Sequence, residues 1–118
     1  MKTIEEVKRV TKIPVVIADE QGYIGHVNHA FEAVFGWTRD EIVGKPLTTI
    51  IPKNLHDAHH LGFSSFLTTG KPKLLAQPLQ LKAVTKDGEE FDAEHFIVAE
   101  RREDHWVFAA TIKPIENH

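Results

Sequence analysis

The sequence contains no cysteine among its 118 residues. This absence excludes disulfide bonds, thiolate nucleophiles, zinc ribbons, iron–sulfur ligation and photochemistry through a cysteinyl–flavin bond. Long hydrophobic runs are also absent, and the N-terminal residues 1–12 mix acidic and basic side chains without an apolar stretch. We therefore expect no secretory signal and no membrane insertion, and we expect the protein to lie in the cytoplasm of a bacterium.

No charge of one sign dominates the chain, which carries 14 Lys and Arg and 17 Asp and Glu residues, for a formal net charge of -3. The basic residues are scattered, so no basic stripe is available to follow a phosphate backbone, and nucleic acid is not expected as a partner. The hydrophobic fraction of 42% and the charged fraction of 26% are typical of a soluble folded domain. The length suits one hydrophobic core.

We expect a single domain over residues 13–115, preceded by a flanking segment at 1–12 and followed by a tail at 116–118. Within the flanking segment, apolar residues recur at helical spacing, which predicts a short amphipathic helix over 3–11. Thr3 and Glu6 have the spacing of a capping box at its start. The apolar stripe of this helix consists of Ile4, Val7 and Val10.

A hairpin is predicted after the flanking segment. Residues 15–18 form a β-branched apolar run, the turn at 19–22 is acidic and ends in glycine, and residues 23–27 continue as a second strand.

Two short helices are predicted after the hairpin. Asn28 precedes a helical apolar pattern that Gly36 ends, and Thr38 forms a capping box with Glu41 for a helix that we expect to stop at Gly44.

The last part of the chain has the alternating pattern of strands. Residues 79–84 alternate, the Asp-Gly pair at 87–88 is a strong hairpin turn, and strands are predicted over 91–100 and 105–115. One face of the second strand would present Phe91, Ala93, His95, Ile97 and Ala99. These elements predict an α+β fold, with a five-stranded antiparallel sheet, short helices on one face, and the N-terminal amphipathic helix.

The spacing of several short motifs resembles that of PAS domains. In the first half the matching residues are Asn28, Phe31, Gly36, Trp37, Glu41, Ile42, Gly44 and Lys45, and in the second half they are Thr69, Gly70, Asp87, Gly88, Glu90 and Phe91. The resemblance covers about residues 13–115. It implies the PAS fold and a role in signal transduction, as a sensor of gas, redox state, light or a metabolite, or as a dimerisation module.

Three histidines lie within the predicted helical segment at 54–70. At about 100° per residue, His59 falls on the apolar side with Leu55 and Phe66, whereas His56 and His60 lie on the shoulder of that stripe. His56 and His60 have i, i+4 spacing, but two histidines lack the further ligands of a stable zinc site.

The chain resembles most closely the oxygen-sensing heme PAS domains of the FixL type, because the Ile-Pro pair at 51–52 and the Thr-Thr pair at 68–69 align without a gap. This resemblance implies heme b as cofactor, with His59 as the axial ligand to the metal. The residues expected around the cofactor are His59, Phe63, Phe66, Lys73, Leu79, Leu81, His95 and Ile97. The sequence departs from the FixL type at Leu79 and Ser65, where that type has arginines. Lys73 is the residue left to receive a propionate, as a point charge.

A different interpretation is that His59 and His95 are half-buried residues, each hydrogen-bonded to a neighbour, with no cofactor. For His95, a polar contact to a ligand is the alternative to a core position. Core packing is predicted for Trp37 and Trp106. His26 and His29 flank Asn28 and are expected to be solvated or associated with the helix cap.

No catalytic motif is present, so we do not expect an enzyme. Two functions remain open: a heme-based gas or redox sensor, or a cofactor-free interaction module that binds no ligand or a different small ligand. In the second case the pocket would be filled by Phe31, Phe63, Phe66 and Phe96, and a homodimer would form through the exposed apolar stripe of the N-terminal helix. A flavin site has less support in the sequence. The expected partner is an output domain or protein such as a histidine kinase, cyclase, chemoreceptor or regulator.

Overall fold

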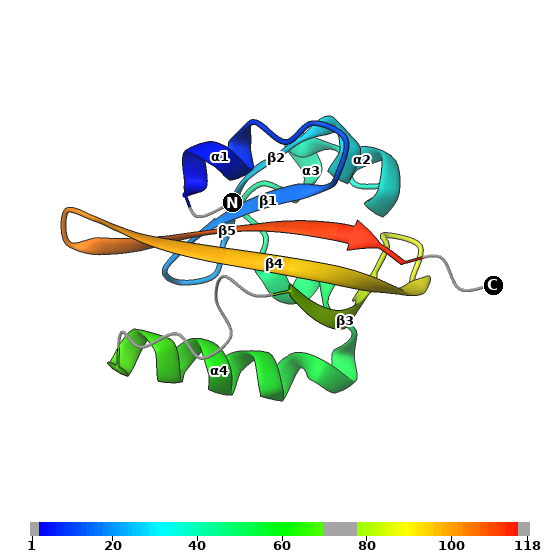
Figure 1. The fold of residues 1–118 in the computed structure, drawn as a ribbon. Coiled ribbons are helices and arrows are strands. Elements are labelled where there is room, and N and C mark those ends of the chain that lie inside the picture. Colours follow the sequence, from blue (N-terminus) through cyan, green and yellow to red (C-terminus); the bar gives the residue numbers. More distant parts are fainter. Residues whose placement is uncertain (1–2, 70–77, 116–118) are drawn as a thin grey trace.

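Five antiparallel strands form one sheet in the computed structural model, which describes residues 3–69 and 78–115 (Figure 1). The strand order is β2-β1-β5-β4-β3. The strands are β1 (Val15–Asp19), β2 (Ile24–Val27), β3 (Pro78–Val84), β4 (Glu90–Arg102) and β5 (His105–Pro114). The helices are α1 (Ile4–Lys8), α2 (His29–Phe35), α3 (Arg39–Ile42), η1 (Leu47–Ile50), η2 (Lys53–Leu55) and α4 (His56–Thr69). The predicted α+β fold is confirmed.

The cap residues start the short helices as predicted. The side chain of Asn28 accepts a hydrogen bond from the Phe31 backbone and begins α2, which ends at Gly36 with a φ of 81°. Thr38 and Glu41 form the complete capping box of α3. The helix α3 ends at Ile42 and not at Gly44, because the Gly44 N–H donates to the Ile24 carbonyl and joins this turn to β2.

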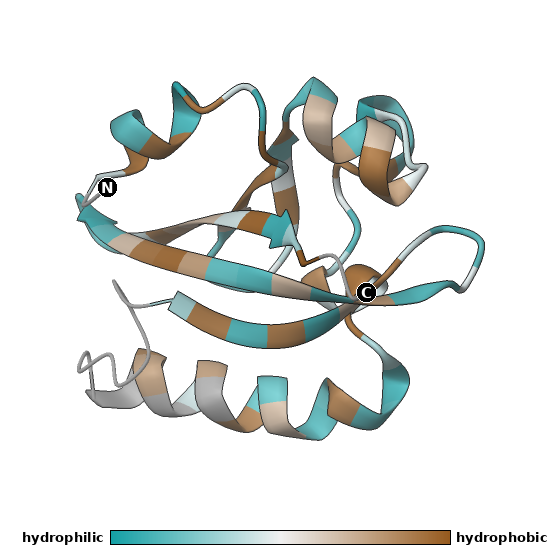
Figure 2. Cartoon of the chain, turned by 45° about the vertical axis from the view of Figure 1, so that its right-hand side comes forward, coloured by the Kyte–Doolittle hydropathy of each residue, from teal (hydrophilic) through white to brown (hydrophobic). Residues whose placement is uncertain are grey.

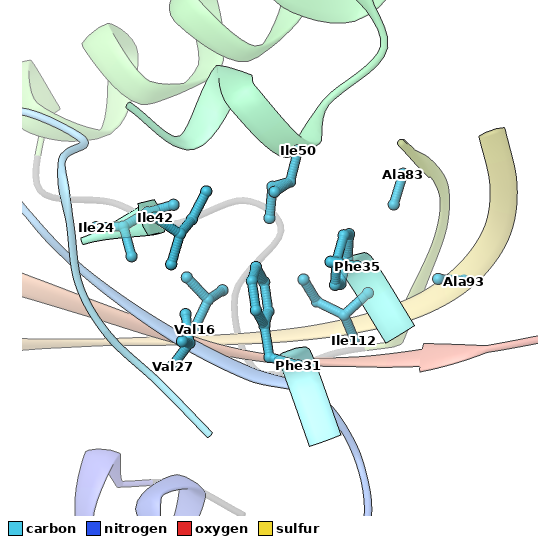
Figure 3. Close-up of a cluster of buried hydrophobic side chains, with 10 residues drawn as sticks. All are labelled: Val16, Ile24, Val27, Phe31, Phe35, Ile42, Ile50, Ala83, Ala93 and Ile112. Carbon is cyan, nitrogen blue, oxygen red and sulfur yellow. The ribbon is translucent and has the colours of Figure 1, made fainter. Parts of the chain in front are cut away.

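Alternation along the strands sorts the side chains onto two faces, and Figure 2 shows hydrophobic and hydrophilic positions alternating along β3. The inner face carries the main core, which lies between the sheet and the elements that follow β2 (Figure 3). This core contains Val16, Ile24, Val27, Phe31, Phe35, Ile42, Ile50, Ala83, Ala93 and Ile112. The predicted face of β4 is confirmed, because Ala93 is in this core and Phe91 packs against it.

The apolar stripe of α1 is covered by the chain's own sheet. Ile4 and Val7 are fully buried, and they pack with Val15, Ile17, Val98 and Ala109 on the outer face of the sheet. Burying two aliphatic side chains contributes about 3–6 kcal/mol to the docking of α1, as an upper estimate. The expectation that this stripe is left exposed for a partner is therefore wrong. The helix is also shorter than predicted, since it ends at Lys8.

Phe96 lies on the outer face as well. It packs against the cluster formed by α1, β1, β4 and β5, so the expectation that Phe96 fills an inner pocket is wrong. The reason is the period of two along β4, which places neighbouring residues on opposite faces.

Asn28 connects three elements through four side-chain hydrogen bonds. Its Oδ1 accepts from the backbone N–H of Val15 at 2.9 Å and of Phe31 at 3.0 Å. Its Nδ2 donates to the carbonyl oxygens of Val10 at 3.1 Å and Ile13 at 2.9 Å. One amide therefore fixes the segment after α1, the start of β1 and the start of α2.

Replacing Asn28 should destabilise the whole fold. We expect Asn28→Ala to lower the free energy of unfolding by about 2–4 kcal/mol, because four backbone groups lose their partner. Asn28→Asp keeps both acceptor bonds but places an acceptor oxygen against the carbonyl oxygens of Val10 and Ile13, so it should also destabilise the fold, by about 1–3 kcal/mol. Urea denaturation followed by circular dichroism measures both values.

The matched control is Thr38→Ala, which removes an exposed cap that serves α3 alone and should cost about 1 kcal/mol. An Asn28→Ala variant no less stable than Thr38→Ala would contradict the role given to Asn28.

Candidate functional site

A ladder of aromatic rings joins α4 to β5 on the inner face. Phe63 packs against Phe108 at 4.9 Å between ring centroids, and Phe66 packs against Phe108 at 5.1 Å. Phe66 also meets Trp106 edge to face at 4.9 Å. The rings therefore fill the space between this helix and this strand, and they hold α4 against the sheet.

A cavity of about 230 Å³ opens beside this ladder, between α4, the turn of the first hairpin and the start of η1. Its described lining consists of Gln21, Gly22, Pro46, Leu47, Thr48, His59, His60, Phe63 and Ser64. None of these lining residues is Asp, Glu, Lys or Arg. The cavity therefore offers hydrogen-bonding groups without a fixed full charge.

His59 is half-buried at this cavity, and its ring centroid lies 5.7 Å from that of Phe63. Burial lowers the pKa of His59, and the nearby His60 and His56 lower it further. The imidazole is therefore neutral at neutral pH, with one ring nitrogen as donor and the other as acceptor.

The other two histidines of α4 have different surroundings. His56 Nε2 lies 2.7 Å from the Ile51 carbonyl oxygen, and because that oxygen only accepts, Nε2 carries the proton and donates. His60 is exposed. Among residues 3–69 and 78–115, no group of three or more His, Asp or Glu side chains could hold a metal ion.

His95 faces the same side of the sheet but not the cavity lining. It pairs with Leu79 on β3 and with Ile112 on β5. Its Nδ1 donates to the Ala93 carbonyl oxygen at 3.2 Å, which raises its pKa slightly, but burial is the larger effect and lowers the pKa. The structure thus gives His95 a backbone partner.

The remaining residues expected around a cofactor are spread along the sheet. Ile97 is half-buried and pairs with Ala110, whereas Leu81 is 42% exposed on the edge strand β3. Lys73 lies outside the described residues. Of the predicted set, the structure brings His59 and Phe63 to the cavity and places Phe66 behind them in the aromatic ladder.

The first hairpin turn and the start of η1 contribute lining residues that sequence reasoning missed. Gly22 has a φ of 86°, and a Cβ atom added there would lie 3.9 Å from the Phe63 ring. In the sequence, only the glycine of the predicted acidic turn could have indicated a close approach at this point. Nothing in the sequence indicates that the turn packs under α4.

Both tryptophans pack against apolar neighbours, as predicted. Trp106 contacts Phe66 from β5. Trp37 packs against the inner core, with the ammonium groups of Lys45 and Lys86 at 5.5 Å and 5.2 Å from its ring centroid.

The described part of this site is too small for heme. A volume of 230 Å³ is below the about 300–1,000 Å³ of pockets that hold drug-sized ligands, and heme is at least as large as such ligands. The adjoining space between α4 and β5 is occupied by the rings of Phe63, Phe66 and Phe108. The predicted heme b cofactor and the FixL-type subgroup are therefore not supported.

Among the described residues, no helix is long and apolar enough to cross a membrane.

Comparison with known proteins shows one family. A family model described as "PAS domain" matches residues 12–114. An uncharacterized protein of Azorhizobium caulinodans is 38% identical over 104 residues, which cover 87% of this chain and 14% of that protein. The chain therefore spans a small part of the length of this relative.

Solved structures match the fold at low sequence identity. The crystal structure of a PAS domain from Colwellia psychrerythraea has a TM-score of 0.72 at 16% identity, over 92% of this chain and 91% of that one. A PAS domain from a two-component sensor histidine kinase has a TM-score of 0.70 at 9% identity, over 93% of this chain and 91% of that one.

The buried histidines should make stability depend on pH. Burial lowers the pKa of His95 from 6.5, so the unfolded chain binds protons more readily than the folded chain. The contribution of neutral His95 to the free energy of unfolding should be present above pH 6.5. It should be lost as the pH is lowered below that value. We expect His95→Gln to show a smaller loss between about pH 7.5 and about pH 5.5, measured by urea denaturation.

The control for this comparison is His29→Gln, since the His29 side chain is fully exposed. An unchanged pH dependence in His95→Gln, or an equal change in both variants, would show that burial of His95 does not govern the acid sensitivity.

Proposed function

The chain belongs to the PAS domain family of sensory and signalling domains, and we propose that its signal is a small uncharged molecule bound in the cavity beside His59. The observation that carries this proposal is the cavity itself, which is lined by neutral polar groups and by apolar side chains. A charged ligand would lose its hydration there without meeting an opposite charge.

The chemistry of the lining suggests how such a molecule would be held. The neutral imidazole of His59 can donate one hydrogen bond or accept one, and the amide of Gln21 and the hydroxyl of Thr48 add further donors and acceptors. Phe63 and Leu47 provide an apolar wall. We infer a ligand with one or two polar atoms and a compact apolar part.

In the proposal, His59 and Phe63 contact the ligand directly, and Phe66 lies behind them in the aromatic ladder. The described lining of the cavity does not include Leu79, Leu81, His95 or Ile97, so the proposal gives them no contact with the ligand.

The aromatic ladder offers a route for the signal. Phe63 lines the cavity and also packs against Phe108 of β5, which is buried. A ligand that displaces Phe63 would therefore change the packing of the central strand. Since a ligand shifts an equilibrium only by binding one state better than another, this contact is where we propose that the two states differ.

Phenol is a suitable probe, because it is small, uncharged and amphipathic. We expect phenol to give saturable shifts of α4 backbone amides in ¹H–¹⁵N NMR spectra. His59→Phe keeps a ring against Phe63 but removes both nitrogens, and it should weaken binding by about threefold to tenfold, because one neutral hydrogen bond contributes about 0.5–1.5 kcal/mol.

The matched control is His29→Phe, the same substitution at an exposed position, which should bind phenol as the unaltered chain does. The proposal fails if phenol gives no saturable shift up to about 20 mM, a range that covers millimolar dissociation constants. Equal affinity of His59→Phe and His29→Phe for phenol would show that His59 does not bind the ligand.

We also propose that the domain acts within a longer protein or on a partner, such as a histidine kinase, cyclase, chemoreceptor or regulator, and that it forms a homodimer. The small share of the Azorhizobium relative that this chain covers supports an input domain of a longer protein. Light scattering tests the homodimer: a mass of twice 13.4 kDa is expected, and the mass of one chain at all concentrations would reject it.

A further inference from the structure

The outer face of the sheet carries a second cavity, which shares no residue with the one beside His59. Its volume is about 610 Å³, within the about 300–1,000 Å³ typical of small-molecule sites. It lies where α1 ends, so the sheet is not covered there by the helix. The apolar floor is formed by Ile17 of β1, which is buried, and Val107 of β5. Ala18 also borders the cavity, but alternation along β1 places its side chain on the inner face with that of Phe108.

Basic side chains from two helices border this floor. Lys8 is the last residue of α1 and Arg39 is the first residue of α3, and both line the cavity. Within the described parts of the chain, neither side chain is in an ion pair with a carboxylate. Two cations from distant parts of the sequence are therefore available at one apolar surface.

Two imidazoles and one carboxylate complete the polar lining. His26 comes from β2 and His105 from the start of β5. Asp19 is the acidic member, and its Oδ1 accepts hydrogen bonds from the backbone N–H groups of Gln21 at 3.0 Å and Tyr23 at 2.9 Å. These bonds engage the carboxylate in the hairpin turn and spread part of its charge over backbone dipoles.

The positive charges act together on the cavity. Burial lowers the pKa of His26, and Arg39 and then Lys8 lower it further. Because Coulomb interactions fall with distance, both cations lie near enough to the same imidazole to disfavour a third positive charge there.

We propose that this cavity binds a small organic carboxylate, with its apolar part on Ile17 and Val107 and its carboxylate between Lys8 and Arg39. The guanidinium group of Arg39 matches a carboxylate with two parallel hydrogen bonds, and Lys8 adds a point charge. Neutral His26 can donate one further hydrogen bond. The apolar floor favours a carboxylate with an apolar part over a simple inorganic anion, which has no apolar surface to bury there.

Such a ligand would connect two helices that pack on different strands of the sheet. Lys8 belongs to the flanking helix α1, whereas Arg39 belongs to α3 beside the edge strand β2. Binding would therefore favour the state in which α1 is docked, because only that state presents both cations to one carboxylate.

Benzoate is the probe for this site, because it combines a carboxylate with a flat apolar ring. We expect saturable ¹H–¹⁵N shifts at Gly25, His26 and Val107 when the full chain is titrated with sodium benzoate. Lys8→Met with Arg39→Met should weaken binding by at least about tenfold, since two charge-assisted contacts are lost. Benzyl alcohol, which has the ring without the charge, should bind correspondingly weakly.

Arg9→Met with Lys12→Met is the matched control, because it removes the same charge from exposed neighbours that do not line the cavity. This control should bind benzoate within about twofold of the unaltered chain at moderate salt, where distant charges are screened. The proposal is overturned if benzoate gives no saturable shift up to about 50 mM, if both double variants lose affinity equally, or if inorganic phosphate binds as tightly as benzoate.

Discussion

The four hydrogen bonds of Asn28 are the constraint on which the two layers of the structure depend. They hold the segment after α1 beside the start of β1, so that α1 can lie on the outer face. They also begin α2, whose Phe31 and Phe35 are fully buried in the inner core. Because β1 is covered on both faces, four consecutive residues, Val15 to Ala18, are buried instead of alternating.

Local chemistry explains what could be predicted from the sequence. The caps at Asn28 and Thr38, the end of α2 at Gly36 and the faces of β4 follow from short-range rules, and all are present. The location of α1 could not be predicted in this way, since an apolar stripe fits the chain's own sheet as well as a partner. Phe96 lies between His95 and Ile97 on β4, so alternation alone is enough to place it on the face opposite to theirs.

The residues of the first cavity are easier to predict from the sequence than those of the second, because short-range rules relate only residues that are close in the chain. His59 and Phe63 are four residues apart on one helix, so helical spacing alone indicates that they share a face. Lys8, His26, Arg39 and His105 are spread over most of the chain, and only the strand order β2-β1-β5 brings them to one surface. On β5 the neighbours Val107 and Phe108 lie on opposite faces. Val107 lines the second cavity, whereas Phe108 packs against Phe63, which lines the first.

Aromatic rings occupy the space beneath α4 that heme would need, and the cavity that remains has room for a small molecule only. Native mass spectrometry of the chain, purified from cells supplied with iron and a heme precursor, tests this claim most directly. We predict chains with no heme and at most a small organic molecule bound. One heme per chain, lost in His59→Phe, would contradict the account.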